Sequence, residues 1–122
     1  YGDSGQNNKI FNNVIYGHVG TGLSIGNFGS GGNNNYIANN IFLKNANSDL
    51  KNNGSGNKLA TNIIGSDPGF VNPDAGDFRI GLQSSPAVDK GTSLGEVQFD
   101  LDRKNRPMGA AYDIGAYEYG GP

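Results

Sequence analysis

The sequence predicts an all-β fold, a right-handed parallel β-helix in which short strands stack as a solenoid of about three to four coils. Three observations point to it: a short segment recurs three times, Gly and Asn are abundant, and large apolar residues recur in register. Of 122 residues 21 are Gly and 18 are Asn, and 34% are hydrophobic. A solenoid needs only a narrow apolar column, whereas a globule with one central core needs more large apolar residues.

The repeated segment reads Asn, any residue, Ile or Leu, any residue, Asn or Thr, Asn, Val or Ile, and Ile or Phe. Its copies are residues 8–15, 35–42 and 57–64, which begin 27 and then 22 residues apart. This spacing is too short for a pair of helices in each unit. Units of this length bury their apolar residues only by stacking on one another, so we expect coils of β-structure.

Side chains alternate between the two faces of a strand, which assigns the residues of each copy to the inside or the outside. Ile10, Ile37 and Leu59 take equivalent inward places. The flanking residues then point outward: Lys9, Tyr36, Lys58, Phe11, Ala38 and Ala60.

A pair of polar residues follows this strand in every copy, and we expect it to form a corner. Asn tolerates the left-handed backbone conformation that a corner needs. Its side-chain amide can also bond to an identical amide in the next coil. We therefore predict a ladder of Asn13, Asn40 and Asn62.

A further strand is predicted in the first two coils, at residues 22–25 and 49–51, with Leu23 and Leu50 in equivalent places. Residues 27–34 and 52–56 are rich in Gly, Asn and Ser and are expected to be surface loops.

The periodicity stops near residue 65, which divides the domain. Residues 1–65 are predicted to form the coils, residues 66–119 a C-terminal cap that covers the last open strand edge, and residues 120–122 the start of a linker. The N-terminal coil is expected to be uncapped, as in a fragment of a longer protein, and open to end-to-end self-association. Within the cap we expect short strands after Asp67 and at residues 77–80, a single helical turn at 86–91, and a strand at 113–119.

The second half of the chain carries an ordered series of motifs. They are residues 67–73, 76–80 and 85–91, then Asp102, Arg106-Pro107, and residues 113–119. The series resembles the C-terminal end of secreted bacterial right-handed β-helix proteins of the pectate-lyase-like superfamily. The resemblance implies a secreted, extracellular bacterial protein that binds or degrades polysaccharide. These motifs mark how the helix ends, and carry little information about its chemistry.

Composition excludes several classes of function. The net charge is −2, with no basic patch of the kind that binds nucleic acid. Cysteine is absent, so there is no disulfide framework and no thiol chemistry. No apolar run approaches the roughly 18 residues of a membrane-spanning helix.

The outward Lys9, Tyr36 and Lys58 are the candidate substrate-binding residues. Stacked coils lie about 4.8 Å apart, which places the two lysines roughly 10 Å apart, on the scale of two sugar units. We expect the lysines to hold uronate carboxylates and Tyr36 to stack on a sugar ring. The alternative is a solvated face with one exposed tyrosine.

Asp100 and Asp102 have the alternate spacing of a chelating pair, and Ca²⁺ is the cofactor that such oxygen ligands suggest. The alternative is that these residues cap their own turns. His18, the single histidine, is expected to lie on the surface, because the sequence identifies no partner for it.

The sequence thus predicts the C-terminal portion of a secreted carbohydrate-active β-helix protein that binds polysaccharide on an outer face, without a complete catalytic site of its own. Two alternatives stay open. One is a polysaccharide lyase that uses Ca²⁺ and Lys9 or Lys58 as base. The other is a structural spacer or cap in a cell-surface protein or adhesin.

Overall fold

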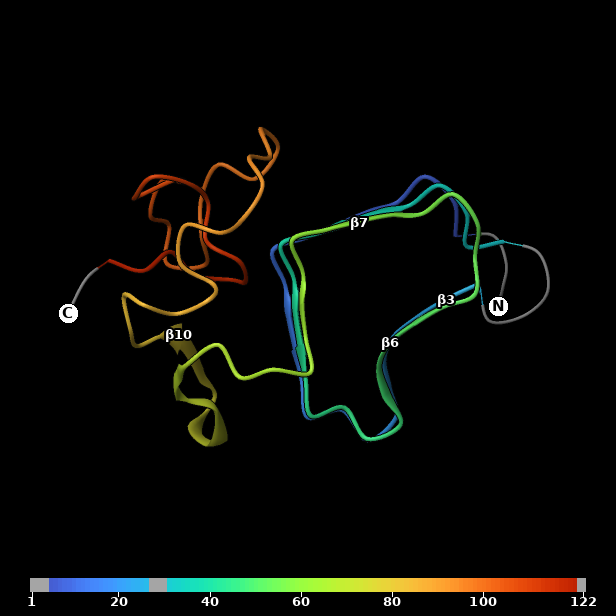
Figure 1. The fold of residues 1–122 in the computed structure, drawn as a ribbon, viewed down its shortest axis with the longest axis horizontal. Helices are drawn as coiled ribbons and strands as arrows, with labels where there is room; N and C mark the ends of the chain where they lie inside the picture. The colour runs from blue at the N-terminus through green and yellow to red at the C-terminus, as the bar shows by residue number, and fades with distance from the viewer. Residues whose placement is uncertain (1–4, 27–30, 121–122) are drawn as a thin grey trace.

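The computed structural model describes residues 5–26 and 31–120, and in them the chain is all-β with almost no helix. The N-terminal half holds strands in a recurring order, and the C-terminal half holds two strands and one short 3₁₀ helix (Figure 1). The elements are β1 (Lys9–Phe11), β2 (Val14–Tyr16), β3 (Thr21–Ile25), β4 (Tyr36–Ala38), β5 (Ile41–Leu43), β6 (Ser48–Asn52), β7 (Lys58–Ala60), β8 (Ile63–Ile64), β9 (Phe70–Asn72), η1 (Pro73–Ala75) and β10 (Asp77–Ile80).

The first eight strands form three parallel sheets. Their orders are β1-β4-β7, β2-β5-β8 and β3-β6, so each strand pairs with its equivalent in the next copy of the repeat. Ile10 pairs with Ile37 and Ile37 with Leu59, while Leu23 pairs with Leu50, which confirms the predicted equivalences. We call residues 5–26 and 31–65 the repeat stack. Figure 1 looks along the stacking direction, and the traces of successive copies overlie one another.

An apolar column fills the inside of the repeat stack. Ile37 and Phe42 are fully buried there, and Ile25 is nearly so. The partly buried residues that complete the column come from the first two copies of the repeat: Ile10, Ile15, Leu23 and Leu50. Alternation along the strands therefore places Ile10 and Ile37 inside as predicted, whereas Leu59, their equivalent in the last copy, stays exposed.

The Asn pairs form the predicted corners, and the two members of each pair have different roles. The first member adopts the left-handed conformation, with φ of 55° at Asn12 and 60° at Asn39; Thr61, with φ of 53°, replaces Asn in the third copy. The second member forms the predicted ladder, because Asn13 Nδ2 donates to Asn40 Oδ1 at 3.1 Å and Asn40 Nδ2 donates to Asn62 Oδ1 at 3.0 Å.

Residues 66–120, which we call the C-terminal region, are mostly irregular. β9 and β10 pair as an antiparallel ribbon, in line with the two short strands predicted there. The strand predicted at 113–119 is wrong, and residues 86–89 form turns without a helix. The backbone N–H groups of Asp113, Glu118 and Tyr119 bond to carboxylates instead of a neighbouring strand, which explains why an alternating pattern gives no strand here.

The C-terminal region packs beside the repeat stack (Figure 1). Ile41 packs against Ile114, and Ala38 packs against Tyr112, so outward residues of the second copy are buried by this region. The expected covering of the last strand edge is not observed. Leu59 and Ile64 in the last copy stay 39% and 47% exposed. The region covers the outer faces of two sheets, which explains why all three residues of β5 are buried.

The first member of each Asn pair fastens this contact. Asn39 Nδ2 donates to the carbonyl of Thr92 at 2.8 Å, and its Oδ1 accepts from the backbone N–H of Thr92 at 2.8 Å. Asn12 Nδ2 donates to the carbonyls of Asp113 and Gly115. The second member of each Asn pair thus joins the repeats to one another, and the first member joins them to the C-terminal region.

Candidate functional site

The structure brings the three predicted binding residues together. Lys9 pairs with Tyr36 and Tyr36 with Lys58 across β1, β4 and β7, so the three side chains form one row on the outer face. Sequence spacing alone implied this row, because the copies stack without a shift in register. The structure does not test the binding role that was predicted for it.

Each member of the row has a protein partner. Lys9 Nζ lies 2.5 Å from Glu96 Oε2, and both side chains are more than half exposed. Lys58 Nζ lies 4.5 Å from the centroid of the Tyr36 ring, a cation–π contact. The rings of Phe11 and Tyr36 form a T-shaped pair with centroids 5.0 Å apart. A ligand at this row has to share Tyr36 with Lys58 and displace Glu96 from Lys9.

Asp100, one of the two predicted metal ligands, is buried and already saturated with backbone donors. Its Oδ1 accepts the N–H groups of Asp102 and Lys104 at 2.8 Å, and its Oδ2 accepts the N–H of Glu118 at 2.9 Å. It organises a turn, as the alternative interpretation of the sequence proposed.

Asp102 also has a protein partner. Arg79 Nε donates to Asp102 Oδ2 and Arg79 Nη2 donates to Oδ1, both at 2.9 Å, as a two-pronged pair. The hydrogen bond from Arg79 lowers the pKa of Asp102. Within residues 5–26 and 31–120 no group of three or more His, Cys, Asp or Glu side chains is placed to hold a metal ion. Both carboxylates predicted to chelate Ca²⁺ are thus engaged by groups of the protein.

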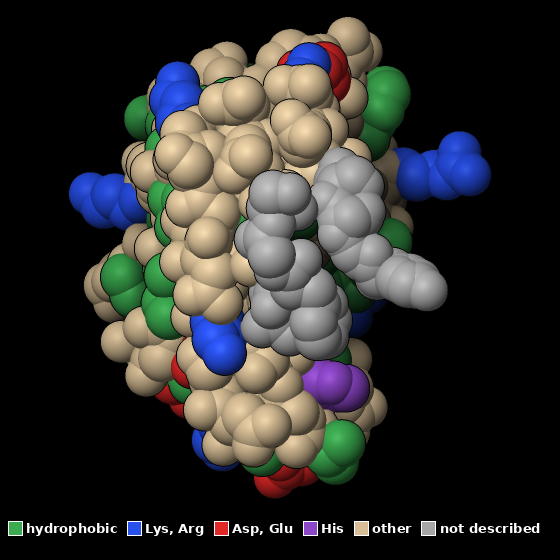
Figure 2. Space-filling view, turned by 90° about the vertical axis from the view of Figure 1, so that its right-hand side faces the viewer, with side chains coloured by type: hydrophobic (Ala, Val, Ile, Leu, Met, Phe, Trp, Pro, Cys, Tyr) green, Lys and Arg blue, Asp and Glu red, His purple; other side chains and the backbone are tan. Residues whose placement is uncertain are grey.

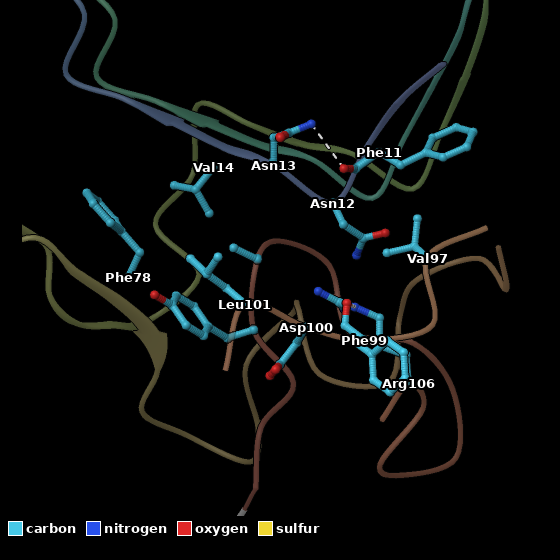
Figure 3. Close-up of a pocket in the computed structure, with 12 residues that line it drawn as sticks. Phe11, Asn12, Asn13, Val14, Phe78, Val97, Phe99, Asp100, Leu101 and Arg106 are labelled. Atoms are coloured by element: carbon cyan, nitrogen blue, oxygen red, sulfur yellow. Dashed lines mark hydrogen bonds between the residues drawn. The ribbon is translucent and has the colours of Figure 1, made fainter. Parts of the chain in front are cut away.

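A groove of about 430 Å³ lies between the first copy of the repeat and the C-terminal region (Figure 3). Figure 3 shows Phe11, Asn13 and Val14 on the repeat side, across from Phe78 and Leu101. The residues that line the groove are Phe11, Asn12, Asn13, Val14, Phe78, Val97, Phe99, Asp100, Leu101, Arg106, Ala116 and Tyr117.

Aromatic and apolar side chains dominate the lining of the groove. Phe99 and Leu101 are 56% and 69% exposed, so this wall is open to solvent. The Tyr117 ring is held in place by Arg79, whose guanidinium carbon lies 4.9 Å from the ring centroid. Of the two Asn residues in the lining, Asn13 is the exposed one, and its Nδ2 donates to the Phe11 carbonyl at 3.0 Å.

The charged residues in the groove wall are not free to bind a ligand. The Arg106 side chain is 1% exposed and its Nη1 lies 2.6 Å from Glu118 Oε2, which is equally buried. Arg106 also donates to the carbonyls of Asp113 and Gly115. The groove therefore offers aromatic surface and an amide, and no available charge of its own within the described part of the chain.

On the face shown in Figure 2, Lys and Arg side chains are scattered among neutral ones. His18 is exposed, and its ring makes no hydrogen bond to any described residue, in line with a surface role. In the described residues no helix is long and apolar enough to cross a membrane.

Sequence reasoning missed the groove. In the strand predicted at 113–119, Tyr117 and Tyr119 would share a face. The structure separates the two tyrosines, since Tyr119 packs into the core while Tyr117 lines the groove. Phe78 and Phe99 lie 21 residues apart in the chain. No periodic pattern in the sequence predicts that these two residues are neighbours, because an irregular region brings them together.

Comparisons of the chain with family models, with curated proteins and with solved structures found no match. Nothing in them identifies its family, so the resemblance described above remains an expectation.

Proposed function

We propose that this chain is the C-terminal portion of a secreted right-handed parallel β-helix protein, with coils at residues 1–65, and that it binds polysaccharide. The parallel sheets and their one-to-one register support a solenoid. Parallel connections in a sheet are almost always right-handed, which supports the hand of the helix. The motif series in residues 67–119 supports the family and, with it, a bacterial extracellular setting.

The observation that carries the binding proposal is the groove. Four aromatic side chains from separate parts of the chain line it: Phe11, Phe78, Phe99 and Tyr117. Binding sites for small molecules and sugars combine such apolar surface with a few polar groups. Sugar rings present C–H groups that pack on aromatic faces, and Asn13 supplies a hydrogen-bonding amide at the rim.

The groove is continuous with the row of Lys9, Tyr36 and Lys58. Phe11 lines the groove and also contacts the Tyr36 ring. Lys58 makes no ion pair with a described carboxylate. We therefore propose an acidic, uronate-containing polysaccharide whose rings lie in the groove and whose carboxylates approach Lys58, with Lys9 exchanging Glu96 for the ligand.

Affinity electrophoresis tests this proposal, with the chain run through gels that contain polygalacturonate, alginate or a neutral glycan. We expect retardation by an acidic polysaccharide, and a loss of affinity of about tenfold in Phe99→Ala. Phe99 is 56% exposed, so the variant should keep its fold. Val71→Ala, at a similarly exposed site on β9, is the matched control.

Lys58→Ala and Lys51→Ala separate the role of the row from that of net charge. Both lysines are exposed and lie on edge strands of the repeat stack, but only Lys58 belongs to the row. Weakened binding in Lys58→Ala alone supports the row. Equal retention of all variants contradicts the proposed site, and no retention at all contradicts binding and leaves the structural spacer. Release of ultraviolet-absorbing unsaturated products, tested with and without Ca²⁺, would indicate the lyase.

A further inference from the structure

Arg79, on β10, bonds to two carboxylates at once. Its Nε and Nη2 donate to the two oxygens of Asp102, both at 2.9 Å, and its Nη1 donates to Asp77 Oδ1 at 3.2 Å. The bonds use all three nitrogens of the planar guanidinium, which fixes its orientation. The Arg79 side chain is 49% exposed and would otherwise be free to sample several rotamers. The two carboxylates therefore hold it in one position.

The guanidinium held in this way covers the ring of Tyr117. Its carbon lies 4.9 Å from the ring centroid, in a cation–π contact. Tyr117 belongs to the lining of the groove, whereas Arg79 does not. Arg79 thus contacts the ring from outside the groove, and the side of the ring that lines the groove stays open to a ligand.

The same side chain connects separate segments of the groove wall. Three of the segments that line the C-terminal side of the groove are Phe78, residues 99–101 and residues 116–117. The last two are joined by the backbone bond from the N–H of Leu101 to the carbonyl of Ala116 at 3.0 Å. In the described part of the chain, the bonds from Arg79 to Asp102 are the only hydrogen bonds between β10 and residues 99–119. The spacing of these segments therefore depends on Arg79.

Stability alone does not account for this arrangement. Arg79 and Asp102 are exposed, and exposed ion pairs contribute little to the stability of a fold. Buried contacts elsewhere hold the C-terminal region together, as the ion pair of Arg106 with Glu118 does. The main effect of the Arg79 contacts is geometric, and it falls on the groove.

We propose that Arg79 is a positioning residue of the groove, which Asp102 and Asp77 hold in place and which orders the Tyr117 ring for stacking on a sugar. The inference rests on the proposed function, because it concerns the same groove and the same polysaccharide. A ring that is ordered before binding loses less conformational freedom when the ligand arrives. Asp102 and Asp77 lie outside the lining and act on the ligand through Arg79.

Asp102→Ala separates this role from a general effect of charge. The variant removes a negative charge from a chain of net charge −2, so electrostatics alone would strengthen the binding of an acidic polysaccharide. Positioning predicts the opposite sign, because Arg79 loses the partner that orients it. We expect the affinity to fall about two- to fivefold, the contribution of one exposed cation–π contact. Asp74→Ala, at an exposed position in η1, removes the same charge and should bind at least as tightly as the parent chain.

Affinity electrophoresis in polygalacturonate and alginate gels measures these affinities and also completes a double-mutant cycle. Arg79→Met should weaken binding, and the double variant with Asp102→Ala should lose no more than Arg79→Met alone, because the two residues act as a unit. Arg79→Lys keeps the charge but lacks the planar fork, so it should stay weakened. Full recovery in Arg79→Lys would show that charge alone matters and would overturn the positioning role.

Nuclear magnetic resonance supplies a spectroscopic signature of the contact itself. The ring current of Tyr117 should displace the side-chain proton signals of Arg79 in the parent chain, and Asp102→Ala should return them toward their ordinary positions. If these signals return while the affinity stays that of the parent, the positioning role is overturned and polysaccharide binding stands. No retention of the parent chain by either polysaccharide overturns the proposed function, and the positioning role with it.

Discussion

The repeat stack and the C-terminal region satisfy their backbone polar groups in different ways. In the stack, neutral Asn amides bond from copy to copy, and the central amide, that of Asn40, both donates and accepts. In the C-terminal region, carboxylates accept backbone N–H groups, as Asp100 does from three residues and Glu118 from Met108 and Asp113. Both regions bury the side chains that do this, Asn40 in the stack and Asp100 and Glu118 in the C-terminal region.

The difference follows from repetition. An amide is self-complementary, so identical amides one strand spacing apart can bond in a continuous ladder. Loops that do not repeat present several N–H groups to one point, and a carboxylate can accept more of them. The buried Glu118 carboxylate is also paired with a cation, the guanidinium of Arg106. We expect a single substitution in the C-terminal region to destabilise much of that region, and a substitution in the stack to destabilise mainly its own surroundings.

Arg106→Met is expected to have the largest effect. It leaves the buried Glu118 carboxylate without its partner, a loss of roughly 3–5 kcal/mol in the free energy of unfolding. Urea unfolding of the variant, beside Arg103→Met at an exposed arginine, measures it. A change as small as that of the control would show that backbone donors alone hold Glu118.

Asn40→Ala removes the central rung of the ladder. Asn13 loses an acceptor and the Ile10 carbonyl loses a donor, so we expect the free energy of unfolding to fall by about 3 kcal/mol. Asn53→Ala, at an exposed loop position, is the control in the same urea series. If Asn40→Ala costs more than Arg106→Met, damage is no more local in the stack than in the C-terminal region.

Asn39→Gly tests the contact between the two regions. Glycine adopts the left-handed conformation of Asn39 without strain but cannot bond to Thr92, so we expect a loss of about 1–2 kcal/mol. Hydrogen exchange should increase in the C-terminal region before it increases in the strands of the stack. A uniform increase throughout the described residues would mean that the two regions unfold as one unit.

Asp102→Asn is expected to have the smallest effect, because Asp102 and Arg79 lie on the surface. The pKa of Asp102 is lowered in the folded chain by the hydrogen bond from Arg79. Its stabilising contribution is therefore present above the ordinary pKa of about 3.9 and is lost as the pH falls through the lower folded value.

The difference in unfolding free energy between the parent chain and Asp102→Asn should accordingly be small at pH 7 and should vanish under acid. Asp74→Asn, in η1, is the control, since Asp74 makes no hydrogen bond or ion pair with a described residue. A difference that grows as the pH falls would contradict the lowered pKa.

Much of the repeat stack was predictable from sequence, because a repeat reports which residues are equivalent and equivalent residues pair. Ile10 with Ile37, Leu23 with Leu50 and the ladder of Asn13 with Asn40 were all predicted in this way. The row of Lys9, Tyr36 and Lys58 was predicted as a row for the same reason. Its partner Glu96 was not, because it lies 87 residues along the chain from Lys9 and outside any repeat.

By itself, then, the sequence determined the all-β class, the parallel register and the inward column, since these depend on periodic patterns of single side chains. The tertiary structure alone decided that residues 66–120 lie beside the stack and leave Leu59 and Ile64 exposed. It also decided that Asp100 and Asp102 bond to groups of the protein, and that Phe11 and Phe99 share a groove. These outcomes depend on how an irregular segment folds back over many residues, and no local pattern specifies that path.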